Sequence, residues 1–206
     1  MALSATLAHR ITHAIFDAQG IAEEKSLDDS RSLDRFLSSV EKRAFQIARL
    51  AVRDADDALD IVQDAMMQLA RRYGQQPVEQ WKPLFYRILQ NRIRDCQRRR
   101  MVRNKLFGWL PTSKFADEEA GDPYEATRDE GQGPAEKVQT DEAMRALEVA
   151  LKALPARQRE AFLLRNMEGM DVADTASAMG CTEGSVKTHY SRAVHTLREK
   201  LGESWG

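Results

Sequence analysis

The feature that most constrains this chain is the spacing of its apolar residues, which recur every three or four positions over long stretches. This spacing gathers them on one side of a helix, whereas a half-buried strand would alternate apolar and polar residues. Three such faces can be traced. The first comprises Leu33, Phe36, Leu37, Val40, Ala44, Ile47, Ala48 and Ala51, and the second comprises Ala58, Ile61, Val62, Ala65, Met66 and Leu69. The third comprises Phe85, Ile88, Leu89, Ile93 and Cys96 and lies on a helix expected over 83–100. The sequence therefore predicts an all-α fold.

A change in composition divides the chain. Between Lys114 and Glu142, ten acidic residues stand against three basic ones, a net charge of −7, and glycine and proline interrupt the segment. Such a stretch cannot bury enough apolar surface to fold alone. A flexible acidic linker is therefore expected at 106–140.

Helical periodicity resumes after this linker with Met144, Leu147, Leu151 and Leu154. Pro155 is predicted to be the first residue of a further helix that runs to Gly169, because proline is well placed where an amide needs no partner. The predicted organisation is an N-terminal extension at 1–32 with a short amphipathic helix at 6–16, a helical domain at 33–105, the linker at 106–140, and a second helical domain at 141–203.

The sharpest local signal lies between residues 171 and 201. Ala176 precedes Gly180 by four residues and Val186 follows it by six, which is the spacing of a helix-turn-helix. Thr182 is suited to cap the second helix, whose buried stripe is expected to be Val186, Tyr190, Ala193 and Leu197. The opposite face carries Ser185, Lys187, Thr188, Ser191, Arg192 and His195, side chains suited to phosphates and base edges. An ordinary solvated face is the alternative, and the helix-turn-helix spacing favours DNA binding over it.

A basic cluster closes the first domain. Seven basic residues from Arg92 to Lys105 are opposed only by Asp95, a net +6 within fourteen residues. Aromatic residues beside a basic helix can stack unpaired bases while arginines hold the backbone. A solvated helix end is an equally good interpretation of the cluster, and Phe85 is expected in the core.

The preceding helix carries acids, and Asp57, Asp60 and Asp64 share one face. One straight helix cannot fold carboxylates around a cation, so a metal site is not expected. A docking surface for a basic partner and a plain solvated face both remain open.

Several classes of function find no support. Cys96 and Cys181 lack zinc or disulfide spacing and fit a reducing cytoplasm. There is no nucleophile–base pair, glycine-rich phosphate loop or metal-ligand spacing, so neither an enzyme nor a bound cofactor is expected.

No run approaches the ~18 apolar residues of a membrane span, and no signal peptide is evident. A cytoplasmic protein without membrane insertion is predicted. Its net charge of −1 means that DNA binding must rely on local patches.

Four motifs in order resemble those of bacterial RNA polymerase sigma factors. Two of them resemble region 2: the D-x-V-Q-[DE] signature at Asp60-Ile61-Val62-Gln63-Asp64, and the Y-R-I-x-x-N-x-x-x-D-x-x-R-R-R run at Tyr86-Arg87-Ile88, Asn91, Asp95 and Arg98-Arg99-Arg100. The other two resemble region 4. Its L-P-x-x-x-R-x-x-F start is similar to Leu154 to Phe162, and its G-[TS]-V-[KR]-[ST] segment matches Gly184-Ser185-Val186-Lys187-Thr188. The presence of regions 2 and 4 alone is similar to the extracytoplasmic-function group. Thr175 departs from the pattern, since an apolar residue is usual there.

The resemblance implies a sigma factor that binds core RNA polymerase and directs promoter recognition, DNA melting and transcription initiation for a specialised stress or envelope-response regulon. The domains at 33–105 and 141–203 would be regions 2 and 4. The implied polymerase-binding residues, on the clamp helices of the largest subunit, are Asp57, Asp60, Gln63 and Asp64. The implied −10 DNA-binding residues are Trp81, Tyr86, Asn91, Arg94, Arg98 and Arg99, and the −35 DNA-binding residues are Ser185, Lys187, Thr188, Ser191 and Arg192. The flap of the second-largest subunit and an anti-sigma factor are further implied partners.

Two other classes of protein share part of this pattern. A response-regulator-type activator has a similar helix-turn-helix, but it usually carries an α/β domain that this strand-poor sequence does not suggest. An adaptor or anti-anti-sigma mimic would keep the docking acids without needing Lys187 and Arg192.

Overall fold

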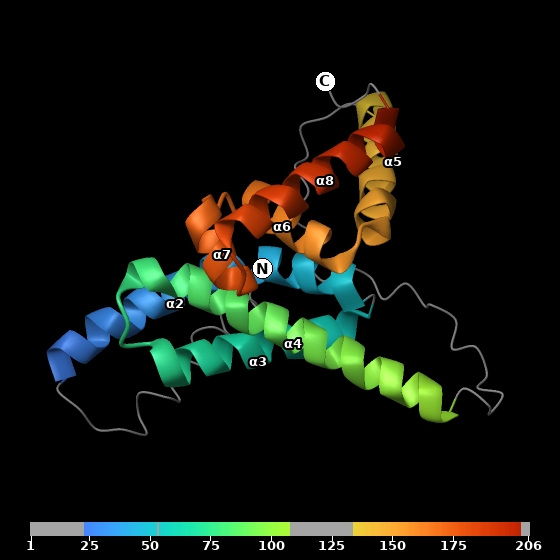
Figure 1. Cartoon of the computed structure of the whole chain (residues 1–206). Coiled ribbons are helices and arrows are strands. Elements are labelled where there is room, and N and C mark those ends of the chain that lie inside the picture. The colour runs from blue at the N-terminus through green and yellow to red at the C-terminus, as the bar shows by residue number, and fades with distance from the viewer. Residues whose placement is uncertain (1–22, 53, 108–133, 203–206) are drawn as a thin grey trace. The chain divides into compact units, whose positions relative to one another are not determined.

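The computed structural model describes residues 23–52, 54–107 and 134–202, and within them the chain forms helices and no strand (Figure 1). The helices are α2 (Glu23–Val52), α3 (Ala55–Tyr73), α4 (Val78–Phe107), α5 (Pro134–Ala153), α6 (Ala156–Asn166), α7 (Val172–Met179) and α8 (Glu183–Leu201). The all-α prediction is confirmed. The helix expected at 6–16 and most of the expected linker lie outside the described residues. Contacts group α2–α4 into one unit and α5–α8 into another, and each unit is described by itself.

In the first unit α2, α3 and α4 each pack against the other two. The predicted apolar faces line this seam, with Phe36 and Ala51 only half-buried. Its buried residues include Leu33, Leu37, Val40, Ala44, Phe45, Ile47, Ala48, Ala58, Ile61, Val62, Ala65, Met66, Leu69, Phe85, Ile88, Leu89, Ile93 and Cys96. Full burial of one large apolar side chain contributes about 1.5–3 kcal/mol, so this seam is the main source of stability for the unit.

Two helices are longer than predicted. Helix α2 begins at Glu23, ten residues before Leu33, because residues 23–32 are mostly polar and offer no apolar stripe to detect. Helix α4 begins at Val78 and ends at Phe107, so Pro83 lies inside it rather than at its start. The missing amide of Pro83 would have bonded the carbonyl of Glu79 in the first turn. The helix therefore loses one hydrogen bond close to its end and remains continuous.

In the second unit α6 is shorter than predicted. Pro155 caps the helix instead of beginning it, and the helix ends at Asn166 instead of Gly169. Gly169 has a φ of 61°, in the left-handed region, which turns the chain out of the helix towards α7. Helix α5 begins at Pro134, so the last residues of the expected linker are helical.

Helices α7 and α8 form the predicted helix-turn-helix. Gly180 adopts φ 63° and ψ 44°, and the amide of Cys181 closes the turn on the carbonyl of Ala176 at 3.1 Å. The Thr182 side chain accepts the amide of Ser185 at 3.2 Å and so caps α8. Val186 is buried as expected. The turn chemistry and the cap expected from the sequence are therefore both present.

We predict that Gly180→Ala lowers the free energy of unfolding by about 1–2 kcal/mol, because a left-handed residue with a Cβ is strained. No atom lies within 4 Å of the Cβ that alanine would add, so this cost is conformational and not steric. Gly184→Ala is the matched control: its Cβ would meet only the Thr182 hydroxyl oxygen, at 3.9 Å, and alanine favours a helix by up to about 1 kcal/mol. Urea denaturation measures both variants, and equal losses would contradict this account.

Candidate nucleic-acid and partner interfaces

The outward face of α8 holds the residues predicted to contact DNA. Lys187, Thr188, Ser191 and Arg192 are exposed, and Ser185 is half-buried. Two of the hydroxyls are already engaged: the Ser185 oxygen lies 2.9 Å from the Thr182 hydroxyl, and Thr188 donates to the Gly184 carbonyl at 2.9 Å. Lys187, Ser191 and Arg192 therefore offer the most accessible donors on this face.

Two arginines of α6 hold the two ends of α7. Arg157 donates to the Met179 carbonyl at 2.8 Å, at the end of α7, and pairs with Glu160 at 3.1 Å. Arg165 donates to the Met170 carbonyl, just before α7 begins. These contacts could not be expected from the sequence, because nothing in the spacing of the two arginines identifies a partner on the next helix.

Tyr190 fixes α8 against α6. Its ring stacks on Phe162 with centroids 6.3 Å apart, and the Arg165 guanidinium lies over the Tyr190 ring, 5.9 Å from its centroid. Its hydroxyl donates to the Asn166 side chain at 3.3 Å. Tyr190 is half-buried, and the bond to Asn166 gives its hydroxyl the partner that a tyrosine in such a position usually finds.

Thr175 occupies the position in α7 where an apolar residue was expected. It is fully buried, and its hydroxyl donates to the Asp171 carbonyl at 2.6 Å. The Asp171 side chain in turn accepts the Asp174 amide at 2.7 Å and caps the helix. The departure is tolerated because the buried hydroxyl is hydrogen-bonded within the first turn.

On α4, four of the residues predicted to bind −10 DNA are accessible. Asn91, Arg98 and Arg99 are exposed, and Arg94 is half-buried and donates to the Asn91 side chain at 2.7 Å. Arg98 is paired with Asp95 one turn earlier. Asn91, Arg94 and Arg98 follow one another at helical spacing, so they form a continuous polar stripe along the helix.

Trp81 and Tyr86, the other two predicted −10 contacts, lie in the core, 2% and 0% exposed, so the structure presents neither side chain at its surface. The Trp81 indole donates to the Tyr73 carbonyl at 3.1 Å and packs 5.8 Å from the Phe36 ring, while Tyr86 meets Phe85 edge-on at 5.1 Å. Large aromatic rings on an amphipathic helix gain more from burial in the seam than from exposure.

The four predicted polymerase-binding residues on α3 differ in their surroundings. Asp60 and Asp64 are exposed, Gln63 is half-buried, and Asp64 pairs with Arg92 at 3.7 Å. Asp57 instead faces α4, where its carboxylate accepts from Arg100 at 2.5 Å and from the Cys96 thiol at 3.3 Å.

The Cys96 thiol is a donor in this arrangement. Burial raises the pKa of Cys96, and the hydrogen bond to the Asp57 carboxylate raises that pKa further. The thiol therefore stays protonated at neutral pH and can donate to the carboxylate.

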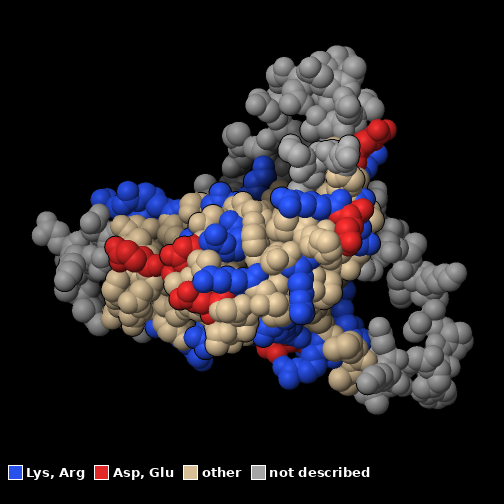
Figure 2. All heavy atoms as spheres, turned by 45° about the horizontal axis from the view of Figure 1, so that its top comes forward, with Lys and Arg blue, Asp and Glu red and all other residues tan. Residues whose placement is uncertain are grey.

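On the face drawn in Figure 2, basic and acidic side chains form small groups that adjoin one another in several places, with uncharged residues over the rest of the face. This agrees with the net charge of −1, which leaves recognition to local patches. Among the described residues, no group of His, Cys, Asp and Glu is arranged to hold a metal ion, and none of the helices there is long and apolar enough to cross a membrane.

Comparisons with known proteins agree with these motifs. Residues 144–197 match the family model "Sigma-70, region 4". The chain is 33% identical over 154 residues to the RNA polymerase sigma-E factor of Streptomyces coelicolor, covering 75% of this chain and 77% of that protein. It is 29% identical over 194 residues to the ECF RNA polymerase sigma factor SigM of Mycobacterium tuberculosis, covering 92% and 87%. The sigma factor RpoE of Bartonella quintana, solved in complex with the anti-sigma factor NepR, aligns with a TM-score of 0.59 at 26% identity, covering 86% of this chain and 98% of that one.

The helical units, the helix-turn-helix and the similarity to these sigma factors together place the chain in a class of transcription initiation proteins. The chain belongs to the extracytoplasmic-function group of bacterial RNA polymerase sigma factors, as its motifs had indicated. Its function is therefore in RNA polymerase-associated transcription initiation, within a family of non-catalytic regulatory proteins.

We predict that Trp81→Phe lowers the free energy of unfolding by about 1–3 kcal/mol, through loss of the bond to Tyr73 and a smaller ring in the core. The affinity for −10 DNA should stay unchanged, because the indole is buried. Urea unfolding and a DNA titration measure the two effects. Weaker DNA binding at unchanged stability would restore Trp81 as a contact.

Proposed function

We propose that this sigma factor binds core RNA polymerase through the acids of α3 and brings it to promoters through α4 and α8. The observation that carries the proposal is the exposed Lys187, Ser191 and Arg192 face of α8 within a capped helix-turn-helix. In helix-turn-helix proteins the second helix enters the major groove, where arginine and lysine pair with guanine edges and with phosphates. This face, with Ser185 and Thr188, would contact the −35 element.

The first unit would contact and melt the −10 element. Asn91, Arg94, Arg98 and Arg99 form an accessible polar surface on α4, and residues 75–80, at the turn before α4 and in its first turn, are exposed. Extruding a base from the duplex costs a few kcal/mol. Contacts from the arginines to the separated strand would offset that cost.

Asp60 and Asp64 would bind basic residues of the clamp helices of the largest subunit, with Gln63 beside them. Regions 2 and 4 would correspond to 33–105 and 141–203, joined by the acidic segment at 106–140. The flap of the second-largest subunit would contact the second domain. An anti-sigma factor is a further expected partner, since the RpoE relative was solved with one. The setting would be cytoplasmic and the target a specialised stress or envelope regulon.

Reconstitution with core RNA polymerase tests the proposal. We expect a stable complex and new, discrete start sites in run-off transcription from a genomic fragment library. Asp60→Lys combined with Asp64→Lys should abolish polymerase binding with helix content unchanged by circular dichroism, because like charges would then face each other. Glu142→Lys combined with Glu199→Lys makes the same change in net charge in the second unit and should still bind. Binding retained by the α3 variant would remove this docking surface.

The α8 face has a separate test. Lys187→Ala should lower the slope of log affinity against log salt for −35 DNA by about 0.9, as expected for one phosphate contact. Arg192→Ala should cost about 1–3 kcal/mol on the specific site and less on a scrambled one if the residue contacts a base. Lys200, which is exposed near the end of α8, provides the control: Lys200→Ala should change neither the salt slope nor the affinity for the specific site. Equal losses for all three variants would indicate a diffuse charge effect without a defined face.

A further inference from the structure

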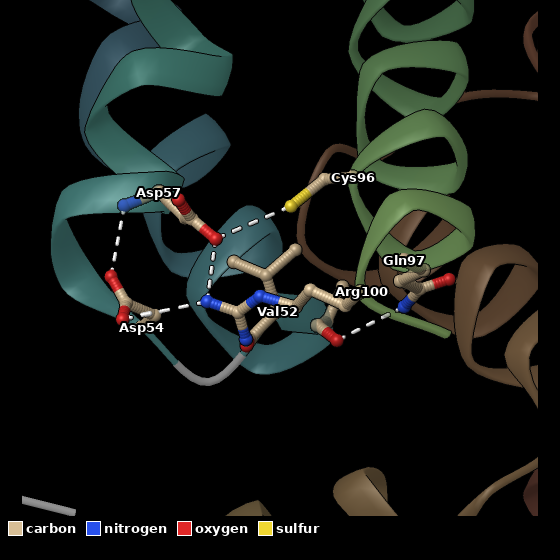
Figure 3. A network of polar contacts seen from close by, with 7 residues as sticks. Val52, Asp54, Asp57, Cys96, Gln97 and Arg100 are labelled. Carbon is tan, nitrogen blue, oxygen red and sulfur yellow. Dashed lines mark hydrogen bonds and ion pairs between the residues drawn. The ribbon is translucent and has the colours of Figure 1, made fainter. Parts of the chain in front are cut away.

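Arg100 of α4 extends back to the corner where α2 ends and α3 begins (Figure 3). Its guanidinium donates to the Val52 carbonyl at 2.5 Å, pairs with Asp57 at 2.5 Å and lies 3.4 Å from an Asp54 carboxylate oxygen. Val52 is the last residue of α2, and Asp54 caps α3 by accepting the Asp57 amide at 2.9 Å. One side chain therefore binds the end of one helix and the start of the next.

Two neighbours on α4 contact the same corner. The Gln97 side chain donates to the Ala51 carbonyl at 3.0 Å, and the Cys96 thiol donates to Asp57 at 3.3 Å. We call this set the corner network: Cys96, Gln97 and Arg100 of α4 with Ala51, Val52, Asp54 and Asp57 of the corner. The last carbonyls of a helix have no partner within it, so this network supplies partners that α2 cannot.

The position of Arg100 differs from that of the two arginines before it. Successive residues of an α-helix point about 100° apart, so three arginines in a row cannot share one face. Arg98 and Arg99 are exposed, whereas the Arg100 side chain is 36% exposed and directed at the corner. Its charge is neutralised by Asp54 and Asp57, which leaves little attraction for phosphate.

We propose that Arg100 is a positioning residue that holds the first turns of α3, and with them Asp60, in a fixed relation to the DNA-facing side of α4. The inference rests on the proposed function of these two surfaces, but Arg100 contacts neither DNA nor polymerase. A guanidinium is suited to this role because its rigid fork of donors binds a carbonyl and a carboxylate at once. A lysine ammonium, on a flexible stem, would replace only part of these contacts.

The experiment uses the full chain with the variants Arg100→Ala, Arg100→Lys, Asp57→Ala and the Arg100→Ala, Asp57→Ala double. Arg99→Ala is the control at the preceding position of α4, where the side chain is exposed. Titration with core polymerase gives the docking affinity. Titration of each holoenzyme with single-stranded −10 DNA at several salt concentrations gives the DNA affinity and its salt slope. All measurements are made at a temperature where circular dichroism finds every variant folded.

We expect Arg100→Ala and Asp57→Ala each to weaken core binding by roughly three- to thirtyfold, the range typical of coupled polar pairs. The double variant should lose no more than either single variant, and Arg100→Lys should recover part of the loss. Arg100→Ala should leave the DNA salt slope unchanged, whereas Arg99→Ala should lower it by about 0.7 without weakening core binding.

Three results would overturn the proposal. Core binding unaffected by Arg100→Ala would assign Arg100 to stability alone. Additive losses in the double variant would mean that Asp57 docks on polymerase independently of Arg100. A fall in salt slope for Arg100→Ala equal to that for Arg99→Ala would make Arg100 a phosphate contact. If Arg99→Ala leaves DNA binding unchanged, the proposed −10 surface fails, while the core-binding results still decide the role of Arg100.

Discussion

The ends of α2 and α7 are held by side chains from a neighbouring helix, and the proposed functional surfaces lie on or beside the helices that follow these ends. A helix leaves its last carbonyls unpaired, and each such group costs about 1–3 kcal/mol if it is buried without a partner. In the first unit Gln97 and Arg100 bond the end of α2, and in the second Arg157 bonds the end of α7. The helices that follow these two ends, α3 and α8, carry the docking acids and the recognition face. Where one helix stops therefore determines how the functional helix after it begins.

Arginine has two separate uses in this structure. Arg100, Arg157 and Arg165 donate to backbone carbonyls within their own units, and Arg98, Arg99 and Arg192 are exposed. A guanidinium suits both uses, because its five donors satisfy carbonyls, carboxylates and phosphates with the same fork. A count of basic residues along the sequence therefore overstates the surface available to DNA. The basic cluster of the first domain includes Arg100, which its acidic neighbours neutralise, and Arg92, which pairs with Asp64.

Features that rest on local rules could be predicted from the sequence. The apolar stripes, the left-handed Gly180 and the Thr182 cap each depend on residues within a few positions of one another. The starts of α2 and α4 could not be predicted, because polar helical residues beyond the stripe give no periodic signal and Pro83 suggested a helix start. The contact of Asp57 with α4 could not be predicted from the sequence either, because its partner Arg100 lies 43 residues further along the chain. The burial of Trp81 was not expected either, because the predicted helix began at residue 83, two residues after it.

The magnitudes indicate what the polar contacts do. A partly exposed ion pair such as Arg100 with Asp57 contributes only about 0–1 kcal/mol, while each large side chain buried in the seam contributes about 1.5–3 kcal/mol. Stability therefore comes mainly from apolar packing. Apolar contacts have no preferred direction, however, and a stripe of leucine, isoleucine and alanine tolerates small rotations of one helix on another. Hydrogen bonds to named carbonyls are directional and define one rotation. In a small helical unit, which buries only about 60% of its unfolded surface, the seam holds the helices together and the directional bonds of the arginines fix the rotation of one helix against another.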